Sequence, residues 1–63
     1  MRKLIEIVYF ENIDRTWDAH AEGKQLVKAA PTYTHANIFV RVLLQEEHDE
    51  YFIDRETIIY YKR

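Results

Sequence analysis

The stretch "DRTWDAHAEGKQLVKAAP" (residues 14–31) decides the fold, because it suits either one helix or one β-hairpin. As a helix it has Thr16 as N-cap, Asp18 near the positive end of the helix dipole, and Pro31 as a stop. Its alanines are strong helix formers and weak strand formers. A helical wheel gathers a core stripe on one side, made of Ala19, Gly23, Leu26, Val27 and Ala30. The favoured interpretation is a helix over residues 16–30.

The alternative is a hairpin over residues 15–30. Glu22-Gly23-Lys24 has good turn chemistry, since glycine adopts positive φ without strain, and the residues before it alternate well. The pairing that follows from this turn is poor, because it sets Trp17 opposite Lys28 and Asp18 opposite Val27. The sequence therefore leaves the hairpin as the second interpretation.

Strand-forming segments flank this stretch. Residues 3–10, "KLIEIVYF", are apolar in both alternating sets, which predicts a central strand covered on both faces. Residues 36–45, "ANIFVRVLLQ", are expected to form a strand with one wholly apolar face and one half-wet face. The apolar face comprises Ile38, Val40, Val42 and Leu44, and the half-wet face comprises Asn37, Phe39, Arg41, Leu43 and Gln45.

The C-terminal part completes the predicted order. "EEHDE" (46–50) is expected to be a polar hairpin tip, followed by a returning strand at 51–53 and a last strand at 57–61 after a tight corner. The prediction is an α+β single domain over residues 1–63, in the order β-α-β-β-β, with an antiparallel meander and one helix on the sheet. If residues 15–30 are a hairpin, the alternative is a small, partly open all-β barrel.

The length limits the stability of this domain. A chain of 63 residues buries only about 60% of the surface that it exposes when unfolded. A core of that size supplies roughly 3–5 kcal/mol, and the chain has no cysteine with which to add disulfides. The N-terminal apolar segment is too short and too soon interrupted by Glu6 and Glu11 for a signal peptide or a membrane span, so we expect a cytoplasmic protein without membrane contact.

Most catalytic classes lack their usual residues here. The chain has neither cysteine nor serine, and it has no glycine-rich phosphate loop. The three histidines, His20, His35 and His48, are spaced in no metal-binding pattern and are expected to face solvent. We therefore expect a protein that is not an enzyme and that has no metal site or other cofactor.

A metal-independent ribonuclease is the one enzyme class that these residues leave open. Histidine, tyrosine and arginine can move protons and stabilise a charged phosphorane without a fixed motif. The residues available for this are His35, Arg41, Arg55 and Tyr60, and nothing in the sequence brings them together.

Binding of single-stranded RNA or DNA is the second functional hypothesis. Small sheets stack bases on exposed aromatic rings beside Lys and Arg. The aromatic pairs are Tyr9-Phe10, Tyr51-Phe52 and Tyr60-Tyr61, and the flanking cations are Lys3, Arg41, Lys62 and Arg63. The formal net charge of −2 opposes this hypothesis, because phosphate contacts supply most of the affinity for nucleic acid.

Protein binding is the first hypothesis, because it explains the same aromatic residues with fewer requirements. Tyrosine and arginine are enriched at protein interfaces. The predicted contact surface is an aromatic and arginine-bearing sheet face that comprises Phe39, Arg41, Leu43, Tyr51, Tyr60 and Tyr61. We expect a small binding module, of the kind that phages and mobile elements use as inhibitors or accessory proteins, that binds a larger protein or forms a homodimer.

Overall fold

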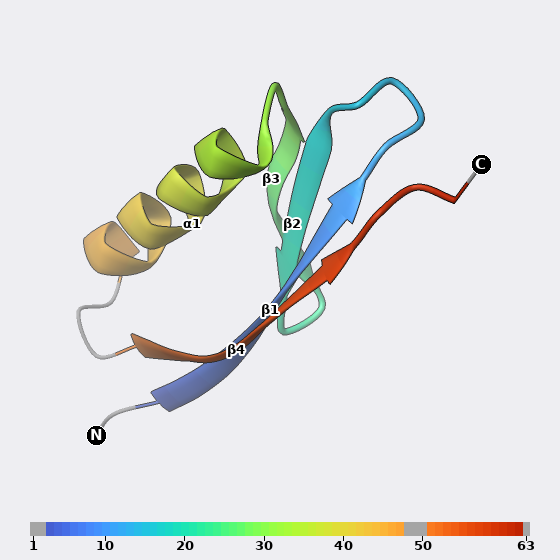
Figure 1. Ribbon diagram of the computed structural model, residues 1–63. Helices are drawn as coiled ribbons and strands as arrows, with labels where there is room; N and C mark the ends of the chain where they lie inside the picture. The colour runs from blue at the N-terminus through green and yellow to red at the C-terminus, as the bar shows by residue number, and fades with distance from the viewer. Residues whose placement is uncertain (1–2, 48–50, 63) are drawn as a thin grey trace.

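The computed structural model describes residues 3–47 and 51–62, which form one helix on one face of a four-stranded sheet (Figure 1). The elements in chain order are β1 (Lys3–Glu11), β2 (Trp17–Ala21), β3 (Lys24–Ala30), α1 (Tyr33–Glu47) and β4 (Tyr51–Ile59). The sheet order is β3-β2-β1-β4, so the sheet stays open. The predicted α+β class is confirmed. The predicted order is wrong, because the helix follows three strands, and the alternative barrel is wrong because the sheet does not close.

The stretch that decides the fold forms the hairpin β2-β3, so the favoured helix over residues 16–30 is wrong. Ala21 pairs with Lys24 across a two-residue turn. Both turn residues have positive φ, 53° at Glu22 and 76° at Gly23, which is the conformation that matches the twist of two antiparallel strands. Turn chemistry therefore prevails over the helix propensity of the alanines.

Two irregularities remove the poor pairing that argued against this hairpin. Beyond His20 the register shifts by one residue, and it shifts again between Ala19 and Trp17. Each shift adds one residue of β3, so that Ala19 faces Val27 and Trp17 faces Ala30. The alternate side chains of β2 then point into the core together with the apolar side chains of β3.

Asp18 holds the second irregularity in place. Ala29 has a positive φ of 56°, and its backbone N–H donates to Asp18 Oδ1 at 2.8 Å. Asn12 Nδ2 donates to the same oxygen at 3.0 Å, and Gln25 Nε2 donates to Oδ2 at 3.1 Å. The hydrogen bond with Ala29 is the first cause that keeps the pKa of Asp18 below its ordinary value. One carboxylate thus fixes the bulge that sets the register of β3.

Gly23→Ala is expected to destabilise the protein by about 1 kcal/mol, because an L-residue with a side chain is strained in the left-handed region. Apart from Gly23 and its two chain neighbours, no residue comes within 4 Å of the position that a Cβ would occupy, so the cost comes from the backbone alone. Gly23→Asn is the matched control, since asparagine tolerates this conformation and should cost less. Urea unfolding measures both variants, and an alanine variant as stable as the wild type would contradict the turn.

Helix α1 begins where Pro31 and Thr32 end the hairpin. Thr32 is the N-cap: its Oγ1 accepts the backbone N–H of His35 at 3.1 Å, and its carbonyl accepts that of Ala36 at 3.1 Å. Ala36, Val40 and Leu44 are buried at intervals of four residues, which places them on one side of the helix. The strand predicted at 36–45 is therefore wrong, because this apolar segment satisfies a helical period as well as an alternating one.

Strand β4 replaces the predicted meander. It runs parallel to β1 as one strand, with an irregularity near Asp54 where the predicted corner was placed. Residues 48–50 of the predicted polar tip lie outside the described residues, and Glu46 and Glu47 fall within α1. The helix supplies the connection that a parallel strand needs to return to the same sheet.

The core lies between α1 and the sheet. It contains eleven buried apolar residues among those described, four of which are alanine, so the interior is thin. Strand β1 is central as predicted, since it pairs with β2 and β4, but it is covered on one face only. Ile5, Ile7 and Tyr9 point into the core, whereas Leu4 is exposed on the other face.

Candidate interaction surface

The contact residues predicted within the segment 37–45 lie on α1 and do not share one surface. Phe39 and Leu43 are four residues apart and lie along one flank of the helix. Arg41 lies about 160° away from both around the helix axis. It faces β4, where its Nη2 meets Glu56 Oε1 at 2.9 Å. The half-wet sheet face predicted from the sequence therefore does not exist.

Two of the predicted contact residues of the C-terminal strand, Tyr60 and Tyr61, follow the last residue of β4. The Tyr60 ring packs edge-on against Trp17, with ring centroids 5.6 Å apart. The backbone N–H of Tyr61 donates to Glu11 Oε1 at 3.1 Å. The side chain of Tyr51 lies outside the described residues. The structure therefore places Tyr60 and Tyr61 close to the end of β1. They are several residues along the chain from Glu56, which is the partner of Arg41.

Arg41 belongs to a polar network that ties α1 to β1 and β4. Its Nε donates to Asn37 Oδ1 at 3.0 Å, and Asn37 Nδ2 donates to the Tyr9 hydroxyl at 3.0 Å. Asn37 Nδ2 also approaches Glu56 Oε1 at 3.3 Å. Because Glu56 compensates its charge, Arg41 serves the fold and is poorly suited to capture a phosphate.

The phenols beside this network stay protonated at neutral pH. Burial, and then the nearby charge of Glu56, raise the pKa of Tyr9 to about 12. The same two causes raise the pKa of Tyr33. The Tyr33 ring packs edge-on against Tyr9 at 4.9 Å and against Trp17 at 5.5 Å. These tyrosines fill space and hold α1 on the sheet.

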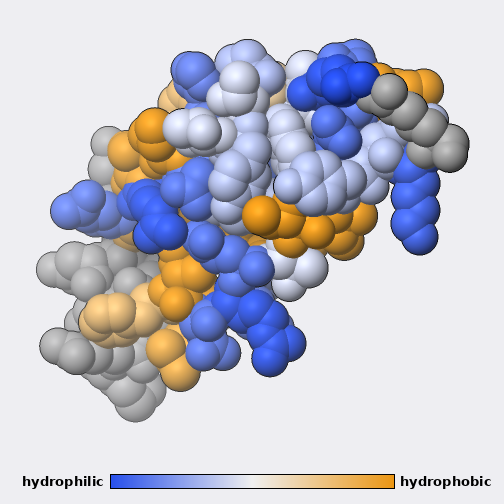
Figure 2. All heavy atoms as spheres, in the orientation of Figure 1, coloured by the Kyte–Doolittle hydropathy of each residue, from blue (hydrophilic) through white to orange (hydrophobic). Residues whose placement is uncertain are grey.

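The outer side of α1 carries exposed apolar side chains. Ile38, Phe39 and Val42 are 55%, 52% and 43% exposed; by helical spacing Ile38 and Val42 lie opposite the buried stripe of the same helix, and Phe39 lies on the flank beside them. We call these three residues the outer stripe of α1. Figure 2 shows hydrophobic side chains reaching the surface over α1 and along the sheet. The sequence interpretation missed Ile38 and Val42, which an alternating pattern assigns to the core; helical spacing would have found them.

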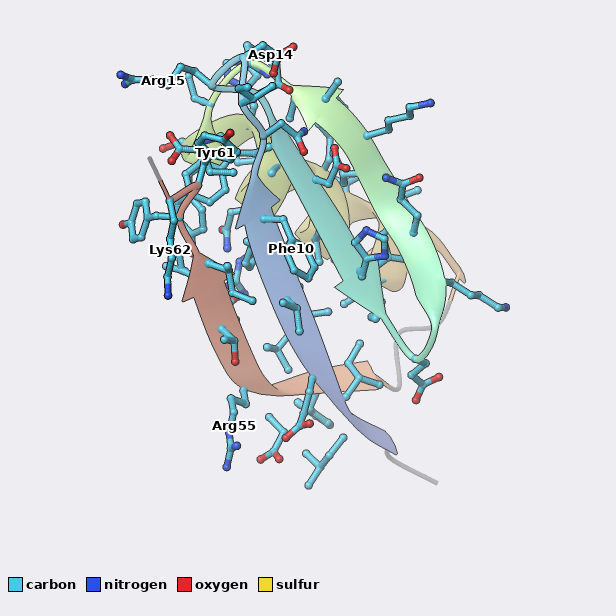
Figure 3. All side chains as sticks on the ribbon, turned by 90° about the vertical axis from the view of Figure 1, so that its right-hand side faces the viewer. Phe10, Asp14, Arg15, Arg55, Tyr61 and Lys62 are labelled. Carbon is cyan, nitrogen blue, oxygen red and sulfur yellow. The ribbon has the colours of Figure 1, made fainter. Side chains whose placement is uncertain are left out.

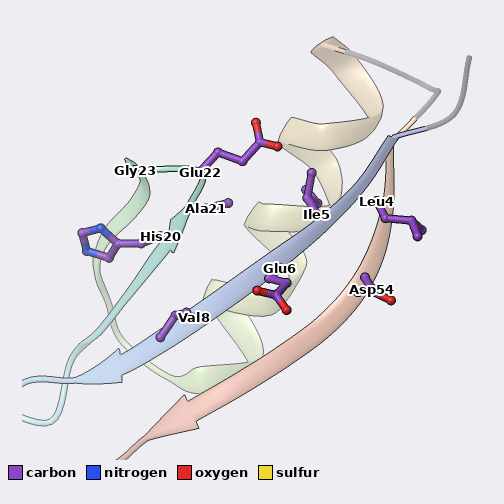
Figure 4. Close-up of a pocket in the computed structure, with 9 residues that line it drawn as sticks. All are labelled: Leu4, Ile5, Glu6, Val8, His20, Ala21, Glu22, Gly23 and Asp54. Carbon is purple, nitrogen blue, oxygen red and sulfur yellow. The ribbon is translucent and has the colours of Figure 1, made fainter.

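The sheet face opposite α1 is open and carries two adjoining hollows. Figure 3 shows this face, with Phe10 pointing out from β1 and α1 behind the sheet. The first hollow, of about 520 Å³, includes Leu4, Glu6, Glu22 and Asp54 in its lining (Figure 4). The second, of about 460 Å³, includes Glu11 and Asp18.

Both hollows are acidic. They share Val8 and His20, and neither lining includes a lysine or an arginine. The His20 ring packs edge-on against Phe10 at 5.4 Å, so its position follows from packing. An acidic lining repels a phosphate backbone, so these two hollows are unfavourable sites for the nucleic-acid hypothesis.

The residues of the ribonuclease hypothesis are not brought together. Arg55 lies near Glu6 on the open face of the sheet, with Nε 3.8 Å from Oε1, whereas Arg41 lies on the helix-covered face. His35 sits at the start of α1, where its Nδ1 is 2.9 Å from Thr32 Oγ1. Within residues 3–47 and 51–62, no three His, Asp or Glu side chains are grouped so that they would hold a metal ion. His48 lies outside those ranges.

The last apolar residues of the chain lie along the outer edge of the sheet. Ile58 and Ile59 end β4, which pairs with β1 on one side and is the terminal strand on the other. They are 39% and 43% exposed, and Tyr60 is 65% exposed. Within the described residues the outer edge of β4 pairs with no other strand, and four consecutive apolar or aromatic residues, 58–61, stand at and just beyond its end.

Comparison with known proteins adds no relative. No family model matches the chain, and no curated protein and no solved structure matches it. In the described part of the chain, no helix has both the length and the apolar character needed to cross a membrane.

Proposed function

We propose that this chain is a small, non-enzymatic protein-binding module whose outer stripe on α1 contacts a larger protein. The observation that carries the proposal is the exposure of Ile38, Phe39 and Val42 on a helix whose opposite side already fills the core. A helix that is apolar on both sides is typical of one that is buried on both sides. The partner surface that suits this stripe is apolar and uncharged.

The role of inhibitor or accessory protein is part of this proposal, and it rests on size and surface chemistry. The chain offers a short helix backed by a sheet, and a polar network between Asn37, Arg41 and Glu56 connects that helix to β4. Side chains presented from a helix that is already packed on a sheet need less ordering on binding than those of a loose segment, which favours blocking or bridging a larger target.

Photo-crosslinking tests the proposed contact. A benzophenone-bearing phenylalanine at position 39 is expected to form an adduct with one larger protein in the native host. The same group at Lys28, an exposed residue of β3, should form none. Adding Val42→Asp to the position-39 variant should reduce the adduct about tenfold, since the loss of an apolar contact worth ~1.4 kcal/mol changes affinity by that factor.

Three outcomes would contradict the proposed contact. Equal adducts from positions 39 and 28 would indicate non-specific capture. An adduct that persists unchanged with Val42→Asp would show that the outer stripe is not the contact. An adduct that nuclease removes, and that weakens steeply with salt, would favour the nucleic-acid hypothesis.

A further inference from the structure

We infer that two copies of this chain pair through the free edge of β4, antiparallel and centred on Ile58, so that one sheet continues across the dimer. This inference names a second partner, on a surface separate from the outer stripe of α1. Figure 3 shows β4 at one edge of the sheet, with β1 on its inner side. A strand edge presents unpaired N–H and C=O groups, which an identical edge can satisfy in both directions.

The backbone of β4 is oriented for this pairing. The N–H of Tyr61 points toward β1, where it donates to Glu11. Backbone groups of an extended chain alternate between its two sides, so those of Ile58 and Glu56 in β4 face the free edge, and the same alternation continued past Ile59 sets Tyr60 there. Pairing centred on Ile58 sets Ile58 opposite its copy and Glu56 opposite Tyr60 of the second copy. The N–H and C=O groups that face the free edge then form the closely spaced pairs of hydrogen bonds that are typical of antiparallel strands.

The charges of β4 exclude the registers closer to its middle. Pairing centred on Glu56 would oppose two carboxylates, and pairing centred on Arg55 would oppose two guanidinium groups. Pairing centred on Thr57 would set Arg55 and Glu56 opposite isoleucines. These charges therefore protect the first half of the edge and leave the second half available.

The register centred on Ile58 places side chains of like character together. Ile58 pairs with Tyr9 of β1 and Ile59 with Phe10, so that Ile58 lies on the helix-covered face and Ile59 on the open face. Across the dimer, Ile58 would meet its copy on one face, and Thr57 would meet Ile59 on the other. Pairing centred on Ile59 would set Ile58 and Thr57 opposite residues 60 and 61 of the second copy, which lie beyond the end of β4. Ile59 would then be the only residue of β4 that faces a residue of the partner strand.

The thin core gives such a dimer a thermodynamic role. Four of the eleven buried apolar residues are alanine, and the chain has no cysteine. A partner that binds only the folded chain adds to its stability in proportion to the logarithm of its concentration. The exposed residues 58–61 are then the surface that a second copy covers.

Single cysteines test the register, because the chain has none of its own. In the inferred dimer, directly opposed residues have Cα atoms about 5.5 Å apart, which suits a disulfide. Ile58→Cys is therefore expected to give a disulfide-linked dimer under mild oxidation. Thr57→Cys and Ile59→Cys are the matched controls; each would lie about 7–8 Å from its copy and should link poorly.

Sedimentation velocity of the wild type accompanies the cysteine series, and a dimer at micromolar concentration is expected. A monomeric wild type overturns the inference. A dimer that links best through position 57 or 59 overturns the register. If the protein is a dimer but none of the three cysteines links it, the second copy binds elsewhere. The same follows if Val42→Asp abolishes the dimer while the fold is kept. Loss of the crosslink at position 39 with an intact β4 dimer would count against the proposed function alone.

Discussion

Val40→Asp is expected to unfold the protein, whereas Val42→Asp should leave the fold intact. Val40 is fully buried on the inner side of α1, and an unpaired carboxylate there costs several kcal/mol. A core of this size provides only about 3–5 kcal/mol in total. Val42 is two residues away on the outer stripe, where a carboxylate stays in water and should change the free energy of unfolding by about 0.5 kcal/mol or less.

This pair of variants also separates the helix from the strand first predicted at 36–45. In a strand, Val40 and Val42 point to the same face, so both variants would unfold. Far-UV circular dichroism and urea unfolding of the two variants decide between these structures. Equal damage from Val40→Asp and Val42→Asp would contradict the helix, and a stable Val40→Asp variant would contradict the described core.

Asp18→Ala is expected to lower the free energy of unfolding at neutral pH by about 1.5–3 kcal/mol, the usual range for hydrogen bonds to a charged group. The variant removes the acceptor for the Ala29 N–H and for the amides of Asn12 and Gln25. Asp18→Asn keeps an acceptor oxygen without the charge and should lose less. Asp54→Ala, at an exposed carboxylate, is the matched control and should be nearly neutral.

The effect of Asp18 should depend on pH in one direction. Its pKa in the folded protein lies below the ordinary value of 3.8, so the carboxylate stabilises the fold fully above that ordinary value. The contribution is lost as the pH falls through the lowered pKa. The difference in unfolding free energy between the wild type and Asp18→Ala should therefore be constant near neutral pH and shrink in acid. A difference that grows in acid would contradict this role.

The sequence alone predicted the α+β class, the single helix and the central position of β1. Residues 3–10 suit only a strand, because β-branched and aromatic residues occupy both alternating sets. The aromatic end of the chain was also evident, and Tyr60 and Tyr61 directly follow β4, the terminal strand of the sheet. These features depend on local composition, which a short window of sequence contains.

Tertiary structure decided where the helix lies. Residues 14–31 and 36–45 each satisfy a helical and an extended pattern, so local propensity could not separate them. The two extra residues of β3 opposite β2 let the hairpin bury Trp17, and the hydrogen bond of Asp18 with Ala29 holds the second of these bulges. Such contacts join residues about ten positions apart. The same limit applies to the candidate surface: Phe39 and Arg41 share a strand face in the sequence pattern, but the helical turn places them on opposite flanks.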